Sequence, residues 1–134
     1  MTLLVDSSVL IGHLRGDAAC TAFLVAHVDI GTDLRVSGVS WAELLAGASL
    51  DAAGEDAVLE FLGMFTPAPV TAAVGTVAGR LLRAHARARG LRVADALIAA
   101  TALDLDCPVA TLDQRHLGAI PGLVVVEPAP VRPA

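Results

Sequence analysis

The chain alternates short apolar runs with longer segments in which apolar residues recur at helical spacing. The runs that we expect to be strands are 3–5, 34–37, 108–111 and 123–126. A short, continuous apolar run is typical of a strand covered on both faces, as in a parallel sheet. Residues 65–70 should also be extended, because Pro67 and Pro69 disfavour a helical conformation in the residues before them.

The intervening segments predict helices, and several of them have recognisable ends. We expect helices over 9–14, 18–28, 40–47, 51–64, 71–89 and 113–117, and another that begins at 93. Asp17 and Thr71 are suited to cap two of them and Gly90 to end one, while Leu59 should face the core. Strands that alternate with helices indicate an α/β protein, here a three-layer α/β/α sandwich around a mostly parallel central sheet.

The composition indicates one folded domain. The 134 residues are 55% hydrophobic, with a mean hydropathy of +0.69, which is too apolar for a disordered chain. We expect a single domain over 1–127, followed by a Pro-rich tail over 128–134. No apolar run reaches the roughly 18 residues of a membrane span, and no signal peptide is evident. We therefore expect a cytoplasmic protein with no membrane partner.

The charged residues exclude several kinds of chemistry. The net charge of −5 argues against bulk electrostatic attraction to nucleic acid. All nine basic residues are arginines, so there is neither a Schiff-base lysine nor a P-loop lysine. Phosphate would have to be bound by arginine, by backbone amides or through a metal ion.

Four carboxylates are expected at one edge of the predicted sheet. Asp6, Glu43 and Asp113 each follow a predicted strand, and ligands of parallel sheets bind just beyond the carboxyl ends of the strands. Asp95 lies in the first turn of an alanine-rich helix, and the small alanine side chains would let that helix approach the sheet closely.

Each of these acids also has a purely structural explanation. Asp6, Asp95 and Asp113 stand where carboxylates commonly cap helices, and Ser40 and Glu43 have the spacing of a capping box. Together, however, four carboxylates at one edge would repel one another, and divalent cations remove that conflict. Oxygen ligands without cysteine or histidine suit Mg²⁺ or Mn²⁺, which can clamp a phosphodiester and activate water.

Four segments, which span nearly the whole chain in order, resemble the PIN domain. They are 5–11 (VDSSVLI), 40–44 (SWAEL) with Gly47, 95–102 (DALIAATA) and 111–117 (TLDQRHL). More narrowly, the chain resembles the VapC-type toxin ribonucleases of bacterial toxin–antitoxin pairs. The resemblance implies a Mg²⁺-dependent endoribonuclease that acts as such a toxin, with Mn²⁺ as a substitute ion. It also implies an RNA substrate, a homodimer and a VapB-type antitoxin whose tail enters the active-site groove.

The resemblance assigns roles to particular residues. The catalytic and metal-binding acids of the family would correspond to Asp6, Glu43, Asp95 and Asp113. Asp113 would orient a second ion or the attacking water, Ser7 would assist through its hydroxyl or amide, and Thr111 would support the turn at Asp113. The family often has a further acid where His116 stands and an aromatic residue at Leu117, so we expect His116 on the surface or beside the ligands.

The arginines have two interpretations. Arg80, Arg83 and Arg87 form one stripe of the helix 71–89, which is either a solvated helix face or a patch that binds RNA phosphates. Arg15 and Arg115 are near Asp6 and Asp113 in the sequence and would flank an RNA groove.

Two alternative functions follow from the same acids. A phosphotransferase of the aspartyl-phosphate kind would need a second acid where Ser8 stands and a lysine, which the chain lacks. A catalytically degenerate PIN domain that serves as an RNA- or protein-binding module is the other alternative, although the presence of all four acids argues against it. The high hydrophobic fraction also predicts an exposed apolar surface for self-association or for an antitoxin.

Overall fold

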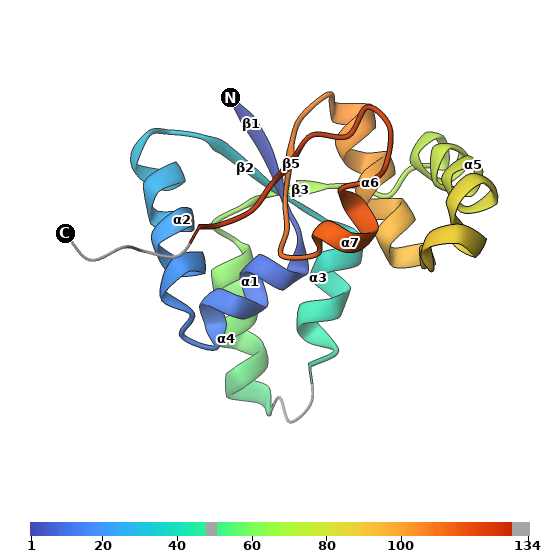
Figure 1. The fold of residues 1–134 in the computed structure, drawn as a ribbon. Coiled ribbons are helices and arrows are strands. Elements are labelled where there is room, and N and C mark those ends of the chain that lie inside the picture. The colour runs from blue at the N-terminus through green and yellow to red at the C-terminus, as the bar shows by residue number, and fades with distance from the viewer. Residues whose placement is uncertain (48–50, 130–134) are drawn as a thin grey trace.

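The computed structural model describes residues 1–47 and 51–129, which form a five-stranded, fully parallel sheet between helices (Figure 1). In chain order the elements are β1 Thr2–Val5, α1 Ser7–Leu14, α2 Ala18–Asp29, β2 Asp33–Ser37, α3 Gly38–Leu45, α4 Ala52–Leu62, β3 Thr66–Ala68, α5 Ala72–Arg89, α6 Val93–Leu105, β4 Val109–Ala110, α7 Gln114–Leu117 and β5 Val125–Val126. The strand order is β3-β2-β1-β4-β5, which puts β1 at the centre. The predicted α/β class with a parallel sheet is confirmed.

Two hydrophobic cores, one on each face of the sheet, create the three layers. Leu3 and Val5 of β1 pack with residues of α1, α2, α3 and α4, whereas Leu4 packs with residues of α5 and α6. Successive side chains of a strand point to opposite faces, so a continuous apolar strand can serve both cores. Figure 1 shows α5 and α6 together on the right, apart from α1, α2 and α4.

Several helix ends lie where the sequence predicts them. The Asp17 carboxylate accepts hydrogen bonds from the backbone N–H groups of Ala19 and Cys20, which caps α2. The Thr71 hydroxyl caps α5 by accepting from Val74 N–H at 3.1 Å. Gly90 ends α5 with φ of 65°, a left-handed conformation that glycine adopts at no steric cost.

Other predictions are wrong in detail. Helix α3 begins at Gly38 rather than at Ser40, because the hydroxyl of Ser37 at the end of β2 accepts from Val39 N–H and starts the helix there. Helix α1 likewise begins at Ser7 rather than at Val9. Leu59 is 37% exposed rather than buried, because α4 packs against the core through Val58, Phe61 and Leu62.

The structure describes only the first two residues of the predicted carboxyl-terminal tail. Residues 130–134 lie outside the described residues, whereas Pro128, the first residue of the predicted tail, is buried. Within the described residues, no single helix is long and apolar enough to cross a membrane; α1 and α2 meet that criterion only together, across a bend of 111°.

Candidate active site

The four predicted acids line one cavity of about 750 Å³ at the carboxyl edge of the sheet. Asp6 lies directly after the central strand β1, and Asp113 stands between β4 and α7. Glu43 comes from α3 and Asp95 from the first turn of α6. The parallel sheet thus brings together acids that are far apart in the sequence.

Asp6 is oriented by two hydroxyl groups. Its Oδ2 accepts hydrogen bonds from Ser8 Oγ and from Thr111 Oγ1, each at 2.9 Å. Asp6 precedes α1 but makes no side-chain capping bond to it, so the capping explanation is wrong for this residue. Within the described residues Oδ1 accepts no hydrogen bond, which leaves it available to a ligand.

Thr111 connects two of the acids. Its side chain is completely buried, and besides donating to Asp6 its hydroxyl accepts from Asp113 N–H at 2.9 Å. Ser8 extends this network, since its Oγ accepts from Leu112 N–H at 3.0 Å. The loop that carries Asp113 is therefore fastened to the loop that carries Asp6.

Glu43 does not belong to a capping box. Ser40 lies inside α3, and the Oε1 of Glu43 instead accepts from Ser7 Oγ of α1 at 3.2 Å. Partial burial raises the pKa of Glu43 above its ordinary value, and the negative charges of Asp6 and Asp95 raise it further. The Ser7 hydrogen bond acts in the opposite direction and is outweighed.

Asp95 and Asp113 do take part in helix ends, as the alternative interpretation predicted. The Oδ2 of Asp95 accepts from Arg92 N–H at 3.1 Å, and the Oδ1 of Asp113 accepts from His116 N–H at 3.1 Å. His116 also turns its ring Nδ1 toward Asp113, 2.8 Å from Oδ2. One ligand atom each from Asp95, Asp113 and His116 lie within 4.8 Å of one another. Asp95 and Asp113 therefore bond to helix ends and line the cavity at the same time.

This donor set fits a hard divalent cation. Asp6, Glu43 and Asp95 each have one oxygen held by a hydrogen bond, while within the described residues the other oxygen of each accepts none. Carboxylate oxygens are the ligands that Mg²⁺ and Mn²⁺ prefer. Burial and the charges of Asp6 and Asp95 raise the pKa of Glu43, and a bound cation would offset the repulsion between these charges.

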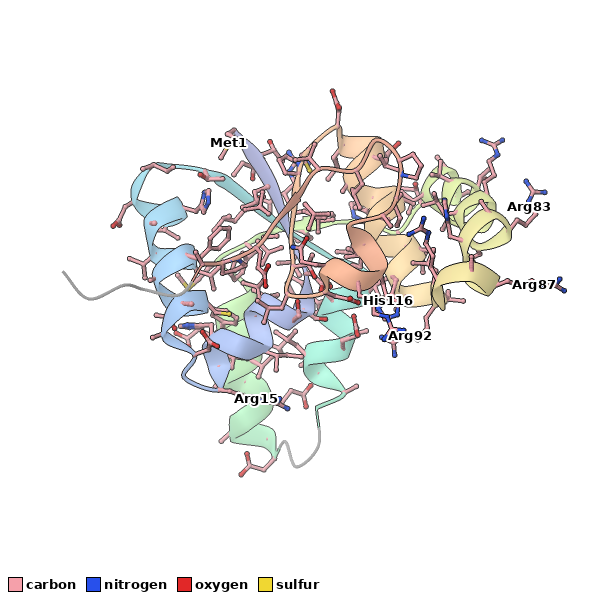
Figure 2. The ribbon with its side chains drawn as sticks, viewed as in Figure 1. Met1, Arg15, Arg83, Arg87, Arg92 and His116 are labelled. Atoms are coloured by element: carbon pink, nitrogen blue, oxygen red, sulfur yellow. The ribbon has the colours of Figure 1, made fainter. Side chains whose placement is uncertain are left out.

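Only some of the predicted arginines lie at the cavity. Arg15 lines it, but Arg80 and Arg83 border a separate hollow on α5. Figure 2 shows Arg83 and Arg87 projecting from α5, away from the rest of the molecule. Arg115 borders a third hollow beside His116.

The sequence analysis missed two residues that shape the cavity. Arg92 lines it, with its Nε 3.5 Å from Oδ2 of Asp95. The spacing of three residues between Arg92 and Asp95 around a helix start was the available signal. The sequence assigns Ser8 no role in the site, yet its hydroxyl donates to Asp6; serine two residues after a loop aspartate commonly forms such a local bond.

Comparisons with known proteins give a consistent picture. Residues 3–122 match the sequence pattern of the PIN domain. The chain is 34% identical to Ribonuclease VapC19 of Mycobacterium tuberculosis over 122 residues, which cover 90% of this chain and 95% of that protein. It is 39% identical to Ribonuclease VapC10 of the same organism over 115 residues, 85% of this chain and 84% of that protein.

Solved structures agree with this result. The crystal structure of VapBC-5 from Mycobacterium tuberculosis, a member of the VapBC family of toxin–antitoxin systems, aligns with a TM-score of 0.62. The sequence identity is 27%, and the alignment covers 94% of this chain and 96% of that chain.

Proposed function

Because the chain belongs to the PIN-domain family and is similar to VapC ribonucleases within it, we propose that it is a metal-dependent endoribonuclease, the toxin of a toxin–antitoxin pair. The observation that carries the proposal is the cavity lined by Asp6, Glu43, Asp95 and Asp113. A degenerate binding module would not need four acids gathered in one cavity.

The four acids are assigned to the metal, with Mg²⁺ as the proposed ion and Mn²⁺ as its substitute. Asp6, Glu43 and Asp95 would bind it through the oxygens that no neighbour occupies, and Asp113 would complete the set. When bound, such an ion supplies an activated water and stabilises negative charge on a phosphodiester.

The remaining residues of the cavity would hold these acids and the substrate. Ser8 and Thr111 fix the rotation of the Asp6 carboxylate, and Ser7 holds Glu43 toward α1. Arg15 and Arg92 line the same cavity, where their guanidinium groups would bind backbone phosphates of RNA. The apolar side chains of Ile11, Ile98 and Leu112 complete the wall.

Cleavage of RNA tests this proposal directly. The purified protein is incubated with cellular RNA in Mg²⁺, in Mn²⁺ and in EDTA, beside Asp6→Asn, Asp95→Asn and the control Asp104→Asn. Asp104 is exposed on α6 and does not line the cavity. We expect discrete, metal-dependent cuts that vanish in the first two variants and persist in the control.

Failure of cleavage would have two distinguishable causes. If no RNA is cut but calorimetry detects Mn²⁺ binding that Asp6→Asn abolishes, the site is intact and the correct RNA was absent. If no Mn²⁺ binds, the degenerate module is the better description. Cutting that persists in both site variants would come from a contaminant.

A VapB-type antitoxin is the proposed partner, since the similar VapBC-5 is a member of a toxin–antitoxin family. The chain offers it an apolar surface over α2 and the end of α4, where Val25 is 52%, Val28 55% and Met64 72% exposed. A groove of about 220 Å³ lies in this surface. Such patches mark protein interfaces.

The other expectations about assembly stay proposals. A homodimer would cover part of the same apolar surface, and light scattering of the purified chain would detect it. A single domain over 1–127 would unfold in one cooperative transition. Because RNA is the proposed substrate, the cytoplasm is the compartment in which the protein would act.

A further inference from the structure

A second hollow lies on the other side of His116 from the four acids. It has a volume of about 380 Å³ and is lined by Ala88, Arg89, Gly90, Arg115 and His116. It will be called the Arg89–Arg115 hollow. The end of α5 and its glycine cap form one wall, and the short helix α7 forms the other.

His116 separates this hollow from the catalytic cavity. Its Nδ1 contacts the Asp113 carboxylate at 2.8 Å, whereas its Nε2 faces Gly90, 3.8 Å from the position that a Cβ on that residue would take. A group held in the hollow would thus be one imidazole ring away from Asp113. Since Gly90 has no side chain, the space between α5 and His116 stays open.

The charge of the hollow favours an anion. Its five described lining residues include two arginines and no carboxylate, and within the described residues neither Arg89 nor Arg115 forms an ion pair. The carboxyl end of α5 carries about half a negative charge, which two full guanidinium charges outweigh. Arginine binds phosphate through paired N–H groups.

We propose that the Arg89–Arg115 hollow binds a phosphate of the RNA strand next to the phosphate held at the four acids. This proposal rests on the proposed function, and it specifies which residues would hold the RNA strand beside the cleaved bond. The hollow would add local positive charge to that of Arg15 and Arg92 at the cavity, in a chain whose net charge is −5. The outward arginines of α5 are not part of it.

Binding of single-stranded RNA without cleavage tests the proposal. A fluorescein-labelled RNA dodecamer of mixed sequence is titrated in EDTA at several salt concentrations, with fluorescence anisotropy as the readout. The variants are Arg89→Gln with Arg115→Gln, and as a matched control Arg80→Gln with Arg83→Gln, which removes the same charge from the separate hollow on α5.

The first pair should weaken binding roughly tenfold or more. Losing this one phosphate contact should also reduce the slope of log K against log salt by about 0.7. The control pair should leave the slope unchanged. Equal slopes for the wild type and the Arg89/Arg115 variant, in a protein that binds and cuts RNA, would overturn the proposal and leave the proposed function intact.

Binding of inorganic phosphate tests the Arg89–Arg115 hollow independently of RNA. At constant pH it should shift the backbone amide resonance of Gly90 in the wild type but not in the Arg89/Arg115 variant. If this shift occurs while the wild type neither binds nor cuts RNA and binds no Mn²⁺, the hollow is an anion site and the proposed function has failed. A shift by phosphate with no effect of the variant on RNA binding would overturn the assignment to RNA.

Discussion

The ring Nδ1 of His116 lies 2.8 Å from Oδ2 and 3.0 Å from Oδ1 of Asp113. The backbone N–H of the same histidine donates to Oδ1 as well. One residue therefore holds both oxygens of this carboxylate. Among the four acids, Asp113 is the one for which a single described residue contacts both carboxylate oxygens.

Replacing His116 should weaken the metal site without destroying it. Partners that orient metal-binding carboxylates contribute about 10- to 100-fold to metal affinity or activity, so His116→Ala should lose that much in Mn²⁺ affinity and in the initial rate of RNA cleavage. The control is His27→Ala, whose ring bonds to Thr32 at 2.9 Å and does not line the cavity. Unchanged Mn²⁺ affinity in the first variant would show that Asp113 does not need its histidine.

Thr111→Val should disturb both stability and activity. The substitution keeps the shape of this buried side chain but leaves Asp113 N–H without its acceptor and leaves Asp6 with Ser8 as its one remaining hydroxyl donor among the described residues. An unsatisfied buried group costs about 1–3 kcal/mol, which urea denaturation would measure, and the cleavage rate should fall too. In the control, Thr101→Val, the lost hydroxyl bonds only to Leu97 O within its own helix, so cleavage should persist. Full activity of Thr111→Val would refute a positioning role.

Glu43 should make the metal-free protein less stable as pH rises. Its raised pKa means that the folded chain keeps a proton in a pH range above the ordinary value of 4.5, where the unfolded chain has lost it. The free energy of unfolding therefore increases as pH falls through the raised pKa and decreases as pH rises through it. Urea denaturation at a series of pH values should show this slope in EDTA, and Glu43→Gln should flatten it.

Metal binding should depend on the same proton. The ion needs the carboxylate form, so Mn²⁺ affinity should fall with pH in that range and each binding event should release protons. Calorimetry in two buffers of different ionisation enthalpy measures the release. If Glu43→Gln releases as many protons as the wild type, Glu43 is not the group that titrates.

Two glycines should respond to alanine in opposite directions. A Cβ on Gly12 would lie 2.6 Å from Sγ of the buried Cys20, so α1 and α2 would have to move apart. We expect Gly12→Ala to lose about 1–3 kcal/mol in the free energy of unfolding. At Gly75, inside α5, no described atom lies within 4 Å of the added carbon, so Gly75→Ala should gain about 0.5–1 kcal/mol. Urea midpoints that shift in the same direction would contradict this packing argument.

Ser40→Ala should stabilise the protein. The Ser40 side chain is completely buried, and its Oγ has no hydrogen-bond partner among the described residues. Removing an unsatisfied hydroxyl from a helix interior should raise the free energy of unfolding by about 1 kcal/mol. A loss of stability in thermal denaturation would mean that this hydroxyl has a partner.

The sequence was sufficient for the sheet edge and its acids because the rule for parallel strands does not depend on packing details. Asp6 and Asp113 each follow an apolar run, and both line the cavity. The family resemblance, carried by four segments, is confirmed by the match over residues 3–122. The roles of the individual acids stay predictions until variants are measured.

The sequence alone could not predict at which residue α3 starts, or whether the arginine stripe of α5 lies near the cavity. Ser37 and Ser40 are equally good caps by residue type, and only the position of β2 decides that Ser37 takes the role. The stripe of Arg80, Arg83 and Arg87 could be recognised, and the apolar residues of the same helix indicate that the stripe faces outward. Val74 and Ala78 are indeed buried, but whether the outward arginines lie near the cavity depends on where α5 packs.

The central position of β1 has a consequence for synthesis. Asp6 is synthesised 105 residues before its partner Thr111, and β1 pairs with β4 only once residues 109 and 110 are available. A nascent chain therefore has no complete set of acids until Asp113 has been added. If the chain cuts RNA, the ribosome that makes it is protected from the product while the residues between Asp6 and Asp113 are added.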